Sequence, residues 1–310
     1  MGCGMSVWLV CDDPGVAQTR LHAANLLINV AEQELSRFRP ESGLNRLNSM
    51  SGQPVKVSPL LWQVLTTALD AAKATGGLYD PTVLKALESA GYRTSFENMA
   101  GREVPLPTPQ TPVRSPFSWR DIRLDHQAQT VTLPEGVGID LGGIAKGWVA
   151  HQAAQSLSGA GPCLVDAGGD IAATGTPPEM EGWPVGVADP FRPDSDLAIL
   201  SVTDHGVATS GVDYRRWTAG GTPQHHIIDP RTGCPARTDI LTVTVIAADA
   251  VQADLHAKVA LILGASPGGE YLAGLTGVEG ILVLQDGSNT TTSGLERYLL
   301  NPGTNPGGSI

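Results

Sequence analysis

The pattern of hydrophobic and polar residues predicts two helices in the first quarter of the chain. In the first, apolar residues recur at the spacing of an amphipathic helix, and the pattern stops at Pro40. Its apolar positions are Leu26, Leu27, Val30, Ala31, Leu35 and Phe38. The second helix has Ser58 as its N-cap and Pro59 in its first turn, and a Gly-Gly pair at 76–77 ends it. We expect residues 77–81 to form a loop after this helix.

Short apolar and β-branched runs between turn residues predict the strands of the fold. They cover residues 7–10, 131–133, 137–141, 163–166, 171–173, 185–187, 198–202, 226–228, 240–247 and 280–284. Further helices are expected from 143 to about 157 and over 253–261. Because strands and helices do not alternate strictly, the sequence predicts an α+β fold in which mixed or antiparallel sheets are flanked by helices.

Composition and charge exclude several classes of protein. The chain has 310 residues, with 31 acidic and 20 basic side chains and a formal net charge of −11. This acidic balance argues against a nucleic-acid partner, which needs a face rich in Lys and Arg. No apolar run approaches the roughly 18 residues of a membrane span, so membrane insertion is not expected. No basic residue precedes Arg20, as a secretory signal would require, so a cytoplasmic location is expected for the chain as written, and an exported form only if it has been trimmed.

One glycine-rich segment, Asp140 to Gly147, joins a predicted strand to a predicted helix. Its glycines allow backbone N–H groups to approach an anion at the N-terminus of the helix. A cation in the first turn of a helix opposes the helix dipole unless an anion lies nearby, so Lys146 favours a phosphate at this position. An ordinary glycine-rich turn with an exposed lysine explains the pattern equally well.

Three more polar groups have both a structural and a functional interpretation. The Gly168-Gly169 pair between two aspartates is typical of a tight hairpin turn. His226 precedes an Ile-Ile pair, where histidine is more often structural, but its near-neutral pKa also suits a general base. Asp254 and Lys258 lie one helical turn apart, either as a surface ion pair or, because the surrounding helix is apolar, as a pair that is partly buried.

Taken in order, these segments resemble the ApbE-like FAD:protein FMN transferase family over nearly the whole chain. The matching segments are Met1-Gly2; Ser36 to Ser42 with Leu47-Asn48; Gly77 to Val83; Asp140 to Gly147; Gly168 to Asp170; Ala208 to Gly211; His226 to Gly233; and Ala253-Asp254 through Gly264. The resemblance implies one catalytic domain over residues 1–300, in one piece or as two lobes with the FAD site between them. Residues 301–310 are expected to form a flexible tail.

The resemblance implies that the protein transfers the FMN half of FAD to a threonine hydroxyl of a target protein, with release of AMP and with the help of Mg²⁺. The residues that it places against FAD are Met1, Phe38, Leu78, Tyr79, Asp80, Asp140, Lys146 and Ile227. It places metal ligands at Gly143, through the backbone carbonyl, and at Asp254. We expect His226 to be the base that removes the hydroxyl proton, and Lys146 to bind phosphate.

Lys258 departs from the family pattern, because the family has a threonine metal ligand at this position. A protonated ammonium cannot ligate a metal and repels one, so the metal site is in doubt. Lys258 can instead place a positive charge beside FAD, held by Asp254. Two alternatives to transfer therefore stay open: a protein that binds or carries FAD without transferring FMN, and an FAD pyrophosphatase that releases FMN and AMP.

Overall fold

The computed structural model describes residues 3–99, 103–104 and 117–300, which divide into two compact units. Among these residues, the first unit comprises residues 29–145 and 214–237, and the second comprises residues 3–28, 146–213 and 238–300. The expected tail at 301–310 lies outside the described residues, and so does Met1.

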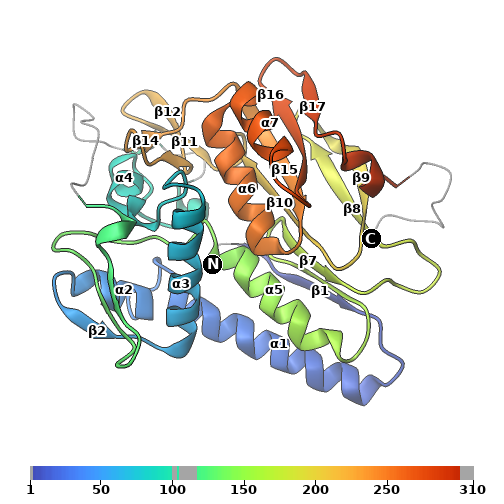
Figure 1. The fold of residues 1–310 in the computed structure, drawn as a ribbon, viewed down its shortest axis with the longest axis horizontal. Helices are drawn as coiled ribbons and strands as arrows, with labels where there is room; N and C mark the ends of the chain where they lie inside the picture. Colours follow the sequence, from blue (N-terminus) through green and yellow to red (C-terminus); the bar gives the residue numbers. More distant parts are fainter. Residues whose placement is uncertain (1–2, 100–102, 105–116, 301–310) are drawn as a thin grey trace. The chain divides into compact units, whose positions relative to one another are not determined.

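A seven-stranded sheet forms the centre of the second unit (Figure 1). Every neighbouring pair in it is antiparallel. In spatial order its strands are β1 (Ser6–Leu9), β6 (Cys163–Asp166), β7 (Asp170–Thr174), β10 (Gly206–Gly211), β15 (Ile240–Ala247), β16 (Glu279–Leu284) and β17 (Asn289–Thr291). The α+β fold with antiparallel sheets is therefore confirmed.

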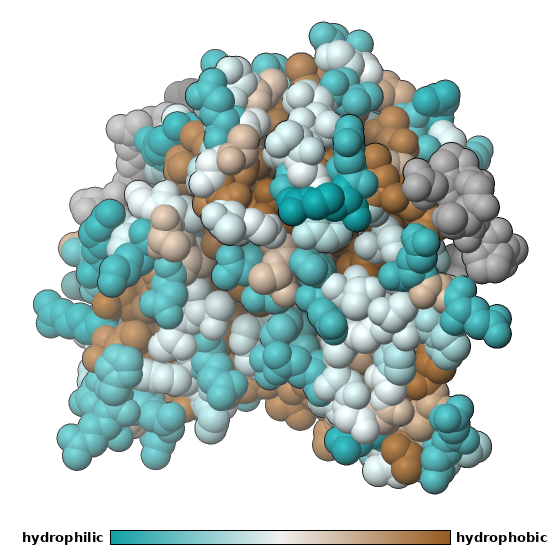
Figure 2. All heavy atoms as spheres, turned by 45° about the vertical axis from the view of Figure 1, so that its right-hand side comes forward, coloured by the Kyte–Doolittle hydropathy of each residue, from teal (hydrophilic) through white to brown (hydrophobic). Residues whose placement is uncertain are grey.

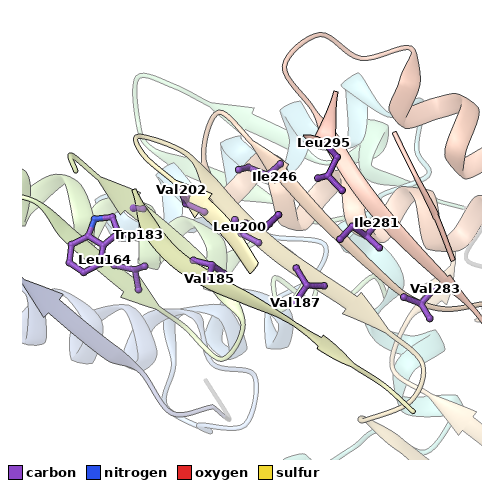
Figure 3. Packing of buried hydrophobic residues seen from close by; sticks show 12 residues of the cluster. Leu164, Trp183, Val185, Val187, Leu200, Val202, Ile246, Ile281, Val283 and Leu295 are labelled. Carbon is purple, nitrogen blue, oxygen red and sulfur yellow. The ribbon is translucent and has the colours of Figure 1, made fainter. Parts of the chain in front are cut away.

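Alternate residues of these strands pack against different partners, as the pleat of a strand requires. Cys163 and Val165 of β6 pack with the alanine-rich face of α5 (Ala145–Ser158) and with Ala24 of α1 (Pro14–Leu35). Leu164 faces the opposite way, towards the hairpin of β8 (Trp183–Asp189) and β9 (Arg192–Val202). Figure 3 shows this second layer, in which hairpin side chains such as Leu200 meet those of the sheet.

Helices α6 (Ala250–Leu263) and α7 (Ala265–Ala273) complete the second unit, and α6 packs on β10 and β15. Asp249 caps α6 by accepting a hydrogen bond from the N–H of Gln252, 2.8 Å away. Most positions of α6 are buried, including Asp254 and His256. A helix that is apolar on nearly every side is typical of the interior of a domain, so its few polar residues need partners.

The first unit consists of short elements. Its helices are α2 (Gly43–Ser49), α3 (Pro59–Ala74) and α4 (Leu84–Ser89), with 3₁₀ turns at Pro81–Val83, Phe96–Asn98 and Trp119–Asp121. Its strands are β2 (Pro54–Lys56), β3 (Glu103–Val104), β4 (Arg123–Asp125), β5 (Thr130–Thr132), β11 (Arg216–Ala219), β12 (Thr222–His225), β13 (Ile228–Asp229) and β14 (Cys234–Pro235). They pair as β2-β5-β4, β12-β11-β3 and β13-β14. The cap and proline predicted for α3 are confirmed: the Ser58 side chain accepts from Leu61 N–H.

The first predicted helix exists, but it begins at Pro14 and ends at Leu35, so Phe38 lies beyond it. The apolar face predicted for this helix is only partly buried: Leu26 is 59% exposed, whereas Ala31 is fully buried. One residue turns a helix by about 100°, and Val30 therefore points away from the side of its neighbour Ala31.

Two predicted strands are wrong. Residues 137–141 are largely buried but form no strand. Instead of pairing with a strand, Ile139 exchanges hydrogen bonds with the Asn48 side chain, at 2.8 and 2.9 Å, and the Asp140 N–H donates to the Pro81 carbonyl. The strand predicted over residues 226–228 is also wrong, because β12 ends at His225 and β13 begins at Ile228.

No helix among the described residues is long and apolar enough to cross a membrane. On the face drawn in Figure 2, hydrophilic side chains are interspersed with hydrophobic ones. The exposed large apolar side chains include Tyr214 and Phe191. Single exposed apolar residues of this kind are ordinary on a protein surface.

Candidate functional site

The loop after α3 is held firmly in the first unit. Gly76 and Gly77 adopt positive φ angles of 62° and 91°, which end the helix. The Tyr79 N–H then donates to the Thr75 hydroxyl at 3.1 Å, and the Tyr79 side chain is buried. Leu78, between these anchors, is half-buried. The loop thus has one well-defined conformation, which suits a binding element.

Asp80 ends this loop as the N-cap of the next 3₁₀ turn. Its carboxylate accepts from the N–H of Thr82 at 2.8 Å and from the Thr82 hydroxyl at 2.7 Å. Burial raises the pKa of Asp80, and the hydrogen bonds from Thr82 oppose that shift. Both interactions fix the carboxylate at the end of the loop.

Asp140 is tied both to this loop and to Phe38. Its N–H donates to the carbonyl of Pro81, directly after Asp80, and its carboxylate forms an ion pair with Arg37, Nε to Oδ2, at 2.8 Å. The Arg37 guanidinium also stacks over the Phe38 ring, at 4.2 Å from the ring centroid. The structure therefore links Phe38, the 78–80 loop and Asp140 within the first unit.

His226 lies between β12 and β13 and faces an aromatic cluster. Its ring meets the Tyr92 ring edge-on, with the centroids 6.4 Å apart, and Tyr92 stacks on Trp217 at 5.2 Å. Burial raises the pKa of Tyr92. Tyr92 also contacts Phe38 edge-on and lies under the Arg37 guanidinium. His226 is thereby connected, through one tyrosine, to the residues around Phe38.

Ile227, next to His226, is buried and fixed by backbone contacts. Its N–H donates to Nδ1 of His225 at 3.3 Å, and its carbonyl accepts from the Ala236 N–H at 2.9 Å. Nε2 of His225 bonds in turn to the Ala236 carbonyl at 2.9 Å. His225 is thus a structural residue of this segment.

The second unit holds a cluster of two lysines and two aspartates. Lys146, in the first turn of α5, pairs with Asp170 at the start of β7. Lys258 pairs with Asp254 one turn earlier on α6, Nζ to Oδ1, at 2.7 Å. The two pairs interact electrostatically: burial, and then the negative charge of Asp254, raise the pKa of Asp170 to about 6, while both lysines lower it.

The sequence pattern explains only part of this cluster. The Gly168-Gly169 turn is indeed a hairpin turn, with positive φ at both glycines, and Gly169 N–H donates to Asp166 at 2.7 Å. Asp170, however, points its carboxylate at Lys146 and is almost fully buried. Asp170 is thus an anion beside Lys146 that belongs to the protein itself, and the phosphate predicted at Lys146 stays a prediction.

Gly143, the other residue predicted as a metal ligand, lies in the turn that precedes α5, within the first unit.

Three residues near the candidate site are not predicted from the sequence. Arg37 and Tyr92 were missed by the sequence reasoning, although Arg37 stands inside the matching segment before Phe38. Asp170 lay inside a matching segment too, but was interpreted as a turn residue.

A comparison with protein-family models matches the ApbE family over residues 1–282. The chain belongs to the ApbE family. Among ApbE relatives, the FAD:protein FMN transferase of Treponema pallidum is 31% identical over 290 residues, covering 87% of this chain and 78% of the relative. That of Salmonella typhimurium is 27% identical over 283 residues, covering 89% and 77%.

Solved ApbE structures share the fold. The ApbE protein of Thermotoga maritima superposes with a TM-score of 0.82 at 27% identity, over 96% of this chain and 97% of that one. The flavin transferase ApbE of Vibrio cholerae gives a TM-score of 0.79 at 24% identity, over 96% of both chains.

Proposed function

We propose that this chain is an FAD:protein FMN transferase, which moves FMN from FAD to a threonine of a target protein and releases AMP. The observation that carries the proposal is the family match over residues 1–282, together with relatives of that name at up to 31% identity. The linked arrangement of Phe38, the 78–80 loop and Asp140 in one unit supports it, since these residues are the ones assigned to FAD.

In this reaction, the threonine oxygen forms a bond to the phosphorus of the FMN half. The phosphoanhydride bond breaks, and AMP leaves with its electron pair. The hydroxyl proton needs an acceptor, and His226 is assigned this role because it lies at a strand boundary beside Tyr92, while His225 is engaged with the backbone. Positive charge near the phosphoryl oxygens lowers the barrier, and Lys146 is assigned to supply it.

The family resemblance implies that Mg²⁺ assists the reaction. Mg²⁺ prefers oxygen ligands in near-octahedral geometry. In the second unit, Asp254 offers carboxylate oxygens, but the position of the threonine ligand holds the ammonium of Lys258, which is bonded to Asp254. The residues present do not fit a complete magnesium site.

Lys258 favours a second candidate function, in which the chain binds or carries FAD without transferring FMN. A monovalent ammonium cannot coordinate the phosphoryl oxygens as a divalent ion does and stabilises developing negative charge less, so it favours binding over chemistry. Hydrolysis of FAD to FMN and AMP is the third outcome, because water can attack the same phosphorus as threonine.

One incubation separates these functions. The purified chain is mixed with FAD and with an acceptor protein of a related transferase, such as that of Vibrio cholerae, with and without EDTA. Transfer predicts AMP in a one-to-one ratio to FMN bound to the acceptor. Free FMN with AMP would instead identify a pyrophosphatase, and unchanged FAD that elutes with the chain would identify a binding protein.

A further inference from the structure

The two lysines and two aspartates of the second unit form an electrically balanced set. The carboxylates are its innermost parts: the side chain of Asp170 is 1% exposed and that of Asp254 is 4% exposed. The ammonium-bearing side chains of Lys146 and Lys258 are 14% and 15% exposed. In each pair, the lysine side chain is therefore the more exposed partner and the carboxylate the more deeply buried one.

A divalent cation does not suit this arrangement. With two lysines and two aspartates the cluster is neutral, so its two carboxylates are already compensated and carry no excess negative charge that would attract Mg²⁺. Lys258 already bonds to Oδ1 of Asp254 at 2.7 Å. A protonated amine has no lone pair with which to bind a metal.

One atom shows how strongly the buried Asp254 depends on Lys258. Oδ2 of Asp254 is buried and has no hydrogen-bond partner among the residues that the structure describes. A carboxylate that is paired through one oxygen only depends strongly on that pairing. Within this cluster, Lys258 is therefore the group that makes a buried, charged Asp254 tolerable.

We propose that the ammonium of Lys258 takes the place of a divalent cation in this chain, so that FAD binding and FMN transfer need no Mg²⁺. The proposal rests on the proposed function, since it assigns the anion that meets the two lysines as the diphosphate of FAD. Lys258 neutralises Asp254 permanently and, with Lys146, presents fixed positive charge to the diphosphate. This role of Lys258 requires neither a change in its protonation nor a bound metal ion.

The test compares the unmodified chain with Lys258→Thr and Lys258→Met. The first measurement needs no activity: the melting temperature and the heat of Mg²⁺ binding are recorded without FAD. The unmodified chain is expected to show no Mg²⁺ effect. Lys258→Thr removes the competing charge and frees the Asp254 carboxylate, so it should gain stabilisation by Mg²⁺. Lys73→Thr, which changes an exposed lysine at the end of α3, is the matched control.

The second measurement is the dissociation constant of FAD, with EDTA and with Mg²⁺. For the unmodified chain the two values should agree. Lys258→Met should bind FAD roughly tenfold more weakly in both conditions, as expected for the loss of one charged contact. Lys258→Thr should bind weakly in EDTA and recover with Mg²⁺.

A clear Mg²⁺ requirement for FAD binding by the unmodified chain would overturn the proposal, whether or not the variants fold. A Lys258→Met variant that folds and binds FAD as tightly as the unmodified chain would also overturn it. The outcome is separable from the proposed function. If the unmodified chain binds FAD without metal but transfers no FMN in either condition, the function fails while the assignment of Lys258 in binding stands.

Discussion

Replacement of His226 by glutamine tests the chemical core of the proposed function. Glutamine keeps a polar side chain of similar length beside Tyr92 but cannot accept a proton near neutral pH. If the imidazole removes the threonine proton, FMN transfer should fall by roughly 10²–10⁴-fold. At about 1.4 kcal/mol for each tenfold change in rate, this is a rise of about 3–5 kcal/mol in the barrier.

The affinity for FAD should change little in this variant. Phe38, the 78–80 loop and Asp140 are held by the Arg37 contacts to Phe38 and Asp140 and by the Thr75 and Thr82 hydrogen bonds, none of which involves His226. The assay is single-turnover transfer with saturating FAD, read by intact mass of the acceptor, with FAD affinity measured separately by flavin fluorescence.

His225→Gln is the matched control for His226→Gln. His225 bonds to the Ala236 carbonyl and accepts from the Ile227 N–H, so its loss should cost about 0.5–1.5 kcal/mol of folding stability for each hydrogen bond. Turnover per folded, flavin-loaded molecule should be unchanged. Equal losses of turnover in both variants, or lost FAD binding with normal turnover in His226→Gln, would refute the assignment of His226 as the base.

Three further predictions follow from packing and charge. Arg37→Met removes the ion pair that holds Asp140, so the dissociation constant of FAD should rise by roughly tenfold or more in a fluorescence titration. Leu200→Ala empties a fully buried position of the hairpin and should cost about 2–5 kcal/mol in urea unfolding. Burial lowers the pKa of His256, so below about pH 6.5 the unfolded chain binds a proton that the folded chain excludes. The stability of the protein therefore falls as the pH drops. In His256→Gln, the melting temperature should depend less on pH between about pH 7 and pH 5 than it does in the unmodified chain.

The elements that the sequence predicts well are those whose signals are local. β6 and β15 match the predicted residues because each is a compact apolar run between turn residues. The start of α3 follows from Ser58 and Pro59, which act on the first turn of their own helix. Such patterns need no knowledge of the rest of the chain.

The errors arise where distant residues supply the backbone partners. Residues 137–141 resemble a strand, but the Asn48 side chain takes the place of a neighbouring strand. Arg37 became visible as a site residue only when folding brought it to Asp140 and Tyr92, which no spacing along the chain indicates. Asp170 was hidden for the same reason, because its partner Lys146 lies on another element.

The most direct test of the central claim is the mass of an acceptor protein after incubation with FAD and this chain. A threonine-containing acceptor of a related transferase is compared with the same acceptor carrying valine in place of that threonine. The proposed function predicts that the threonine acceptor gains the mass of one FMN, with an equal amount of AMP, and that the valine acceptor gains nothing. Full consumption of FAD with no mass gain on the threonine acceptor would contradict it.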